Sequence, residues 1–239
     1  MTLIGLDMID MLPILSIVIP TRNSAKFLAH CVDSLKQQSF RNFEVVFVDC
    51  ASTDGTLEIA ASFLQGRVLA QGGVGLAAAW NQGILASRGE YIGFLDSDDW
   101  WEPDCLSSHM DGLLASAELD YSIGSVRYFA QSKDKLPNGF KPDLLNGSYP
   151  ALMPGCFVGK KSLFDRIGLF DESLVITPDI QWFHDLKLTD ALFKEMGTTV
   201  LNKRVHAQNL SYSLSTTPVY NAEILRVLQR RLKRMPNRD

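Results

Sequence analysis

The stretch "ILSIVIPTRNSAKFLAHCVDSLKQQSFRNFEVVFVD" (residues 14–49) decides the fold. It opens with an apolar, β-branched run at 14–20, which is typical of a strand buried on both faces. Behind Asn23 and Ser24, which are favourable helix N-caps, apolar residues recur at helical spacing: Phe27, Leu28, Cys31, Val32 and Leu35. A second strand-like run follows at 43–49. This order of strand, helix and strand predicts one unit of a parallel α/β sheet.

The same alternation continues to residue 96. Helical patterns at 52–65 and 76–87 alternate with strand-like runs at 67–71 and 91–96. Parallel sheets of this kind carry helices on their faces. We therefore predict an α/β fold with a mainly parallel central sheet flanked by helices.

The second half of the chain is less regular. It predicts a helix at 103–117, a strand at 122–130, a long loop at 131–149, a short helix at 162–166, a helix with Trp182, Leu186, Phe193 and Met196 inward, and a strand at 198–207. No internal repeat or clean linker divides the chain. We therefore predict a single domain over residues 1–217, with halves at about 14–100 and 101–217, and a separate helix at 218–239.

Charge and cysteine usage narrow the class of protein. The formal net charge of -4 argues against nucleic acid as a partner, because surfaces that bind nucleic acid are basic. The four cysteines lie far apart and form no disulfide framework or zinc motif, which suits a reducing compartment. The N-terminal 20 residues contain Asp7 and Asp10 but no basic residue, and no apolar run reaches the roughly 20 residues of a membrane span. These features predict a soluble protein of the cytoplasm.

The C-terminal tail differs in charge from the rest of the chain. Residues 221–239 hold six basic and two acidic residues, a net charge of +4, so the remainder carries -8. At helical spacing the tail has an apolar series: Ile224, Leu228, Leu232 and Met235. Three alternatives remain open for this helix: packing on the domain, formation of a homo-oligomer, and peripheral docking at the inner face of an anionic membrane.

Polar clusters follow three of the predicted strands, at 20–23, 49–56 and 96–99. In an open parallel sheet, ligands bind beyond the carboxyl ends of the strands. Each cluster alone is explained by a turn and a helix cap. Because all three would converge on one edge of the sheet, the sequence favours a nucleotide site there.

The third cluster lies in "GEYIGFLDSDDWW" (residues 89–101), where three carboxylates fall within four residues. Carboxylates this close repel one another unless a positive charge lies between them, and a metal ion is the usual candidate. The alternative is a polar turn in which Asp98 or Asp99 caps a helix that Pro103 opens. The residues alone leave both interpretations open.

A glycine-rich segment offers a different hypothesis. "GGVGLAAAW" (residues 72–80) mimics a dinucleotide-binding G-x-G-x-x-A motif through Gly73, Gly75 and Ala78. It is third in the strand–helix order, whereas a dinucleotide fingerprint normally occupies the first turn of the unit. A dehydrogenase is therefore disfavoured.

Taken in order, the segments 16–56, 77–101 and 153–174 resemble a family 2 glycosyltransferase with the GT-A fold. The resemblance runs from Leu15 to about residue 213. It implies an inverting enzyme of glycan or glycoconjugate biosynthesis that uses a nucleotide-diphosphate sugar, UDP- or dTDP-linked, and a divalent metal, Mn²⁺ or Mg²⁺. The implied acceptor is a glycan, a lipid-linked molecule or a small molecule. The Gln-any-any-Arg-Trp signature of processive synthases is absent from the sequence, so one sugar per encounter is expected.

The resemblance also implies roles for individual residues. Asp49 matches the acid that holds the base of the donor. Asp96 and Asp98 match an Asp-any-Asp motif, with Asp98 as the direct metal ligand. His206 matches a histidine that completes the metal site or touches the diphosphate, although a histidine with an ordinary hydrogen bond on an edge strand is an equal alternative. The other positions matched to the nucleotide-sugar site are Pro20, Thr21, Asn23, Ser52, Asn81 and Ser97.

In "VITPDIQWFHDLK" (residues 175–187), the resemblance implies that Asp179 is the base that deprotonates the acceptor. Asp179 would also suit the first turn of the helix that bears Trp182, which is a candidate for the acceptor side. Asp185 is the alternative base, about a turn and a half further along that helix.

Three positions depart from the family pattern: Cys50 replaces a common second Asp, Trp80 a common Arg, and Pro178 a common Glu. Two alternatives therefore accompany the enzyme hypothesis. One is a nucleotide-sugar-binding protein without transfer activity, and the other is a glycoside hydrolase with Asp98 and Asp179 as its carboxylate pair.

Overall fold

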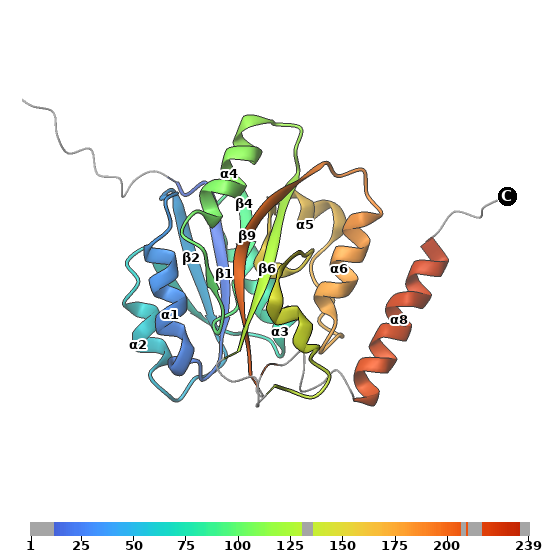
Figure 1. Ribbon diagram of the computed structural model, residues 1–239, viewed down its shortest axis with the longest axis horizontal. Helices are drawn as coiled ribbons and strands as arrows, with labels where there is room; N and C mark the ends of the chain where they lie inside the picture. The colour runs from blue at the N-terminus through green and yellow to red at the C-terminus, as the bar shows by residue number, and fades with distance from the viewer. Residues whose placement is uncertain (1–11, 131–135, 207–208, 210–216, 235–239) are drawn as a thin grey trace, which may run out of the picture.

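The computed structural model describes residues 12–130, 136–206, 209 and 217–234 (Figure 1). Among these residues, nine strands form one sheet in the order β3-β2-β1-β4-β8-β6-β9-β5, and β7 pairs with β6. Figure 1 shows the strands at the centre of the molecule with helices around them. The predicted α/β architecture is confirmed.

The first four strands are parallel, as the sequence predicts. They are β1 (Leu15–Thr21), β2 (Phe43–Asp49), β3 (Gly66–Ala70) and β4 (Tyr91–Phe94). All seven residues of β2 are buried, because both of its faces are covered by helices. The pairing of β1 with β2 sets Thr21 opposite Asp49, so the polar residues that end these two strands lie side by side.

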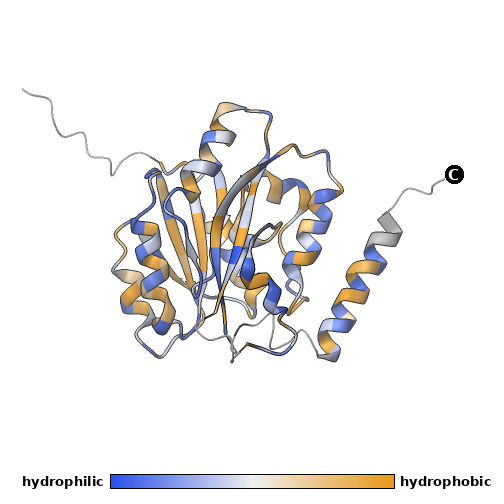
Figure 2. Cartoon of the chain, in the orientation of Figure 1, coloured by the Kyte–Doolittle hydropathy of each residue, from blue (hydrophilic) through white to orange (hydrophobic). Residues whose placement is uncertain are grey.

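The sheet separates two apolar cores. One contains the inward residues of α1 (Ala25–Lys36), α2 (Thr56–Ala61) and α4 (Cys105–Ala115). The other contains those of α3 (Leu76–Ala86), α5 (Ser162–Ile167) and α6 (Pro178–Lys187). Alternate residues of β1 point into opposite cores, since Ile17 lies in the first and Val18 in the second. Figure 2 shows the hydrophobic residues concentrated along the strands and the strand-facing sides of these helices.

The second half of the sheet is mixed. It comprises β5 (Trp100–Trp101), β6 (Tyr121–Ala130), β7 (Ser148–Pro150), β8 (Phe157–Lys160) and β9 (Phe193–Val205), with 3-10 turns η2 (Pro142–Asn146) and η3 (Pro154–Cys156). β8 is antiparallel to β4 and β6, whereas β9 is parallel to β6. The short strand β5 pairs with β9 and so brings the acidic turn between β4 and β5 against the end of β9.

Two predictions about this half need correction. Phe193 and Met196 lie in β9 rather than on a helix, because pairing with β6 and stacking of Phe193 on Tyr121 override the local helical spacing. The predicted loop at 131–149 contains η2 and the start of β7 in its described part, and residues 131–135 lie outside the described residues.

The C-terminal helix α8 (Pro218–Arg234) lies beside α6 at the edge of the molecule (Figure 1). It packs through Glu223 and Val227, which are buried, and not through the predicted apolar series, since Leu228 is 46% exposed. The side chains of Leu232 and Met235 lie outside the described residues. None of the helices in the described ranges is long and apolar enough to cross a membrane.

Candidate active site

The three polar clusters that follow β1, β2 and β4 meet at one edge of the sheet. The backbone N–H of Asn23 donates to Ser52 Oγ (2.9 Å), and the N–H of Thr53 donates to Asn23 Oδ1 (2.8 Å). Ser24 Oγ lies 2.8 Å from Ser97 Oγ, which joins the first cluster to the third. The convergence expected from the parallel topology is therefore present.

Asp49 is the centre of the second cluster. Its carboxylate accepts hydrogen bonds from Thr21 Oγ1 (2.8 Å), Ser52 N–H (2.9 Å) and Ser52 Oγ (2.6 Å), and the residue is 4% exposed. Ala51, two residues after Asp49, and Asn23 of the adjoining loop have φ angles of 50° and 47°, a conformation that non-glycine residues rarely adopt. Strained backbone of this kind is frequent where a loop is shaped for a ligand.

The third cluster is an acidic group formed by Asp96, Asp98 and Asp99. One carboxylate oxygen of each lies within 4.8 Å of the others. Lys203 of β9 reaches into this group, with its Nζ 3.1 Å from Asp96 Oδ2 and 3.0 Å from Asp99 Oδ2. A cation from the chain itself therefore separates two of the three acids, which the sequence analysis missed.

Burial and the neighbouring charges act in opposite directions on the pKa values of this ion pair. Burial opposes the charge of Lys203, but Asp99, Asp96 and Asp98 together hold the pKa of its ammonium well above the ordinary value. Burial also raises the pKa of Asp99, as do the neighbouring carboxylates, whereas Lys203 and the N–H of Arg204 (2.7 Å) stabilise its ionised form. The net effect is a pKa of about 8 for Asp99.

Asp98 faces a different set of partners. Its Oδ2 lies 3.0 Å from His206 Nε2 and 3.1 Å from Asn209 Nδ2. Burial opposes ionisation of Asp98, but His206 and Lys203 hold its pKa below the ordinary value. The predicted association of His206 with the acidic group is thus present in the structure.

Arg204 of β9 holds the acidic turn between β4 and β5 in place. Its Nε donates to the backbone oxygen of Asp98 (2.9 Å), and its guanidinium lies 4.9 Å from the ring centroid of Trp100 and 5.1 Å from that of Phe27. Trp101 is buried and donates its Nε1–H to the carbonyl of Gly155 (2.8 Å). The two tryptophans after the acids therefore pack and hold the turn.

The residues present fit a divalent cation at Asp98 and His206. Carboxylate oxygens are the ligands that Mg²⁺ and Mn²⁺ prefer, and a neutral imidazole is the commonest side-chain partner of bound metals. The carboxyl of Asp98 is held ionised, as a ligand must be. Lys203 shares its single positive charge between Asp96 and Asp99, so Asp98 is the candidate for the principal anionic ligand of the group.

Asp179 lies in the first turn of α6, after Thr177 as the N-cap and Pro178. Burial and the charge of Asp96 together raise its pKa to about 6, although the hydrogen bond from the N–H of Ile180 lowers it. Asp179 is therefore within electrostatic reach of the acidic group, and its pKa suits a general base near neutral pH. The alternative base Asp185 lies 3.7 Å from His184 Nδ1.

Two candidates take structural positions. Trp182 is 3% exposed, stacks on Phe164 and donates to the carbonyl of Gly168 (2.8 Å), so its suggested place on the acceptor side is not supported. Asn81 is also buried, and its amide bonds both backbone groups of Phe170 and Oε1 of Glu172. Its role toward the donor stays a prediction, and so do the roles of the remaining positions at the rim.

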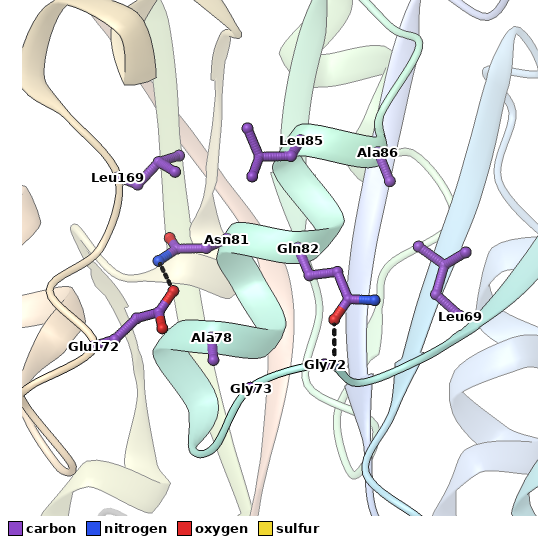
Figure 3. A pocket seen from close by; sticks show the side chains of 10 residues that line it. All are labelled: Leu69, Gly72, Gly73, Ala78, Asn81, Gln82, Leu85, Ala86, Leu169 and Glu172. Atoms are coloured by element: carbon purple, nitrogen blue, oxygen red, sulfur yellow. Dashed lines mark hydrogen bonds between the residues drawn. The ribbon is translucent and has the colours of Figure 1, made fainter.

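A cavity of about 510 Å³ lies between α3 and the chain segment of Leu169 and Glu172. Figure 3 shows the side chains that line it. The glycine-rich segment lines it, but its pattern has a packing explanation. A Cβ at Gly73 would lie 2.8 Å from the Cβ of Ala78, so only glycine permits this close approach. Trp80, at the start of the same helix, is 2% exposed and packs against Phe94 and Phe170.

Comparison with known proteins connects this site to a reaction class. Residues 16–168 match the family model described as Glycosyl transferase family 2. An uncharacterized glycosyltransferase of Rickettsia typhi is 32% identical over 88% of this chain and 70% of its own length. The hyaluronan synthase of Pasteurella multocida is 37% identical over 85% of this chain, but this covers only 22% of that protein.

Among solved structures, S. aureus TarS in complex with UDP-GlcNAc superposes with a TM-score of 0.69 over 90% of this chain and 65% of that chain. The sequence identity is 23%, so this likeness shows the fold alone. It identifies the mixed sheet and its helices as the GT-A fold.

Proposed function

The chain belongs to glycosyltransferase family 2, and from this premise we propose that it moves one sugar from a nucleotide-diphosphate sugar, UDP- or dTDP-linked, to a hydroxyl group of an acceptor, with inversion. The acceptor class we propose is a growing glycan, a lipid-linked molecule or a small molecule of glycan biosynthesis. The hyaluronan synthase relative and the UDP-GlcNAc complex of TarS support this class of donor and product.

The observation that carries the proposal is the arrangement at the rim of the sheet. The hydrogen-bonded carboxylate of Asp49 ends β2, and Asp98, which is paired with His206, follows β4. These two strands lie on either side of β1, and the contact of Ser24 with Ser97 joins the loops that follow β1 and β4. We propose Asp179 as the third acid of the site, because burial and the charge of Asp96 raise its pKa to about 6. A nucleotide, a diphosphate and an acceptor hydroxyl need these three kinds of group.

For donor binding, we propose that Asp49 accepts a hydrogen bond from the base of the nucleotide. Thr21 and Ser52 fix the orientation of its carboxylate, so the acceptor atoms are in place before the donor arrives. Pro20, Asn23, Ser97 and Asp96 would shape the loops that receive the ribose and diphosphate, with Asn23 already bonded to the Asp49 loop.

The diphosphate would lie at Asp98 and His206, which would hold Mn²⁺ or Mg²⁺. A divalent cation supplies Lewis acidity that stabilises the charge on the leaving diphosphate. Lys203 adds a fixed positive charge beside the same group. As the bond between the anomeric carbon and the phosphate oxygen breaks, its electron pair leaves with the diphosphate.

The acceptor oxygen attacks the anomeric carbon from the face opposite the leaving group, which inverts the configuration. Asp179 would take the proton of the acceptor hydroxyl through its carboxylate. Its pKa of about 6 leaves it ionised at neutral pH but still basic enough to share the proton in the transition state.

A panel of nucleotide sugars tests the proposal. Release of free nucleoside diphosphate is measured with Mn²⁺, with Mg²⁺ and with EDTA, for the wild type and for Asp179→Asn. We expect turnover of at least one UDP- or dTDP-sugar that EDTA abolishes. Binding of a nucleotide sugar without turnover would favour the binding-protein alternative, and metal-independent cleavage of a glycoside would favour the hydrolase.

For localisation we propose the cytoplasm, with peripheral contact at the inner membrane face through α8. Leu225 (58% exposed) and Leu228 (46% exposed) share an outer face of this helix with the exposed Arg226 beside them. Flotation of the protein with anionic phosphatidylglycerol vesicles tests this contact. Recovery of the protein in the bottom fraction would favour a tail that packs on the domain. A dimer by light scattering would favour a tail that self-associates.

A further inference from the structure

Glu223 of α8 makes an unusual set of contacts for a residue of a surface helix. Its carboxylate accepts hydrogen bonds from three successive backbone N–H groups, those of Val175 (2.7 Å), Ile176 (3.0 Å) and Thr177 (3.0 Å). It also accepts the hydroxyl of Thr177 (3.1 Å), and the residue is 2% exposed. Burial opposes the charge, but these donors hold the pKa of Glu223 below the ordinary value.

A second contact fastens α8 to the same region. Arg230 Nη1 donates to Asp171 Oδ2 (2.8 Å) and to Gln181 Oε1 (2.7 Å), and Val227, one turn from Glu223, is buried. Asp171 precedes the segment that Glu223 holds, and Gln181 lies on α6 after it. The helix therefore holds the segment 171–181 at three points.

That segment contains Asp179. Thr177 is the N-cap of α6, but its side chain makes no capping bond and is bonded to Glu223. Pro178 follows with its fixed φ, so little backbone freedom separates the residue that Glu223 holds from Asp179. A change in the loop before α6 must therefore change both the position and the burial of Asp179.

We propose that Glu223 is a positioning residue for Asp179, which makes the C-terminal helix part of the acceptor side of the site. The proposal rests on the proposed function, in which Asp179 is the base. Loss of Glu223 would displace and hydrate Asp179 while leaving Asp49, Asp98 and His206 in place. The rate of proton removal from the acceptor would then fall, whereas the affinity for the donor would not change.

The test compares Glu223→Ala and Glu223→Gln with Gln229→Ala, an exposed position on the same helix, all in the full chain. Three quantities are measured: the Kd of UDP with Mn²⁺ by calorimetry, amide hydrogen exchange of residues 175–180, and the pH profile of turnover. The turnover substrate is UDP-GlcNAc or the best nucleotide sugar of the panel. Circular dichroism confirms that each variant is folded.

For Glu223→Ala we expect amide exchange at 175–177 to accelerate. We expect kcat to fall about 10- to 100-fold while the Kd of UDP stays unchanged. The acid limb of the pH profile of turnover should move below pH 6. Glu223→Gln keeps an acceptor oxygen and should lie between this variant and the wild type. Gln229→Ala should match the wild type.

Accelerated exchange with unchanged kcat and pH profile would overturn the proposal, because Glu223 would then only stabilise the fold. If Glu223→Ala does not fold, the same criteria apply to Glu223→Gln. A wild type that turns over no nucleotide sugar would instead refute the proposed function and this proposal with it. An active wild type with unaffected variants refutes the positioning role alone.

Discussion

The ammonium of Lys203 lies 3.0 Å from the carboxylate of Asp99, inside the acidic group that closes β4. The same ammonium lies 3.1 Å from Asp96, so one side chain of β9 shares its single positive charge between two acids. Lys203 therefore reduces the repulsion within the group, and the contact between Asp98 and His206 is the side of the group that we propose for a metal. Lys203 thus explains how three carboxylates can be held so close together.

Replacing Lys203 by methionine leaves Asp96 and Asp99 without their cation. Because Asp99 is buried, we expect a loss of unfolding free energy on the order of 3–5 kcal/mol. Added MnCl₂ should raise the Tm of Lys203→Met more than that of the wild type, since the variant site is more negative. Thermal denaturation with and without MnCl₂ measures both effects.

The matched control is Lys36→Met, which removes an exposed ion pair with Asp33 and should change stability by less than about 1 kcal/mol. Equal stability of Lys203→Met and Lys36→Met would contradict the structural role of the buried ammonium.

The raised pKa of Asp179 predicts opposite effects on activity and on stability. If Asp179 is the base, as proposed, it works only when ionised, so turnover should rise with pH through about 6 and then level off. Because the folded pKa lies above the ordinary 3.8, the folded protein holds this proton more tightly. The resulting stabilisation is complete below about pH 4 and is lost as the pH rises through about 6.

Asp179→Asn removes the cost of burying the charge. We therefore expect a higher Tm than that of the wild type at pH 8, together with a loss of turnover of about 10²- to 10⁴-fold. Asp185→Asn, two turns into the same helix, is the control and should keep turnover within a few fold. A greater loss in Asp185→Asn than in Asp179→Asn would identify Asp185 as the base.

The hydrogen bonds around Asp49 predict a separate effect on nucleotide binding. Ser52→Ala removes the donor 2.6 Å from Asp49 Oδ1 and should weaken UDP binding about tenfold, since the carboxylate loses its fixed orientation. Asp49→Ala should weaken binding further, with kcat at saturating donor little changed. Calorimetry with UDP measures the affinity, and an unchanged Kd in Asp49→Ala would place the nucleotide elsewhere.

The sequence predicts the donor side of the site better than its cationic side. Asp49 and Asp98 follow parallel strands, and parallel strands end at one edge of a sheet, so local patterns suffice to bring these residues together. Lys203 and Arg204 reach the same edge only because β5 pairs with β9 across about a hundred residues, and no local pattern encodes that pairing. The sequence signal for this cationic side of the site was the pair Lys203 and Arg204, which stand shortly before His206.

Local periodicity also misassigned residues whose environment is set by long-range packing. Met196 has helical spacing from Trp182 but lies in β9, whereas Trp182 lies inward on a helix as predicted, in the aromatic core with Phe157 and Phe164. In the sequence, Glu223 is one of two acids in a basic tail. Its role could not be predicted, because its partners are backbone groups of a distant loop.

The most direct test of the account is the metal dependence of UDP binding at Asp98, measured by calorimetry for the wild type and Asp98→Asn with Mn²⁺ and with EDTA. We predict that Mn²⁺ strengthens UDP binding to the wild type at least tenfold and has no such effect on Asp98→Asn, while the two proteins bind equally in EDTA. Equal enhancement by Mn²⁺ in both proteins would contradict the assignment of the acidic turn as the place where a divalent cation and the diphosphate meet.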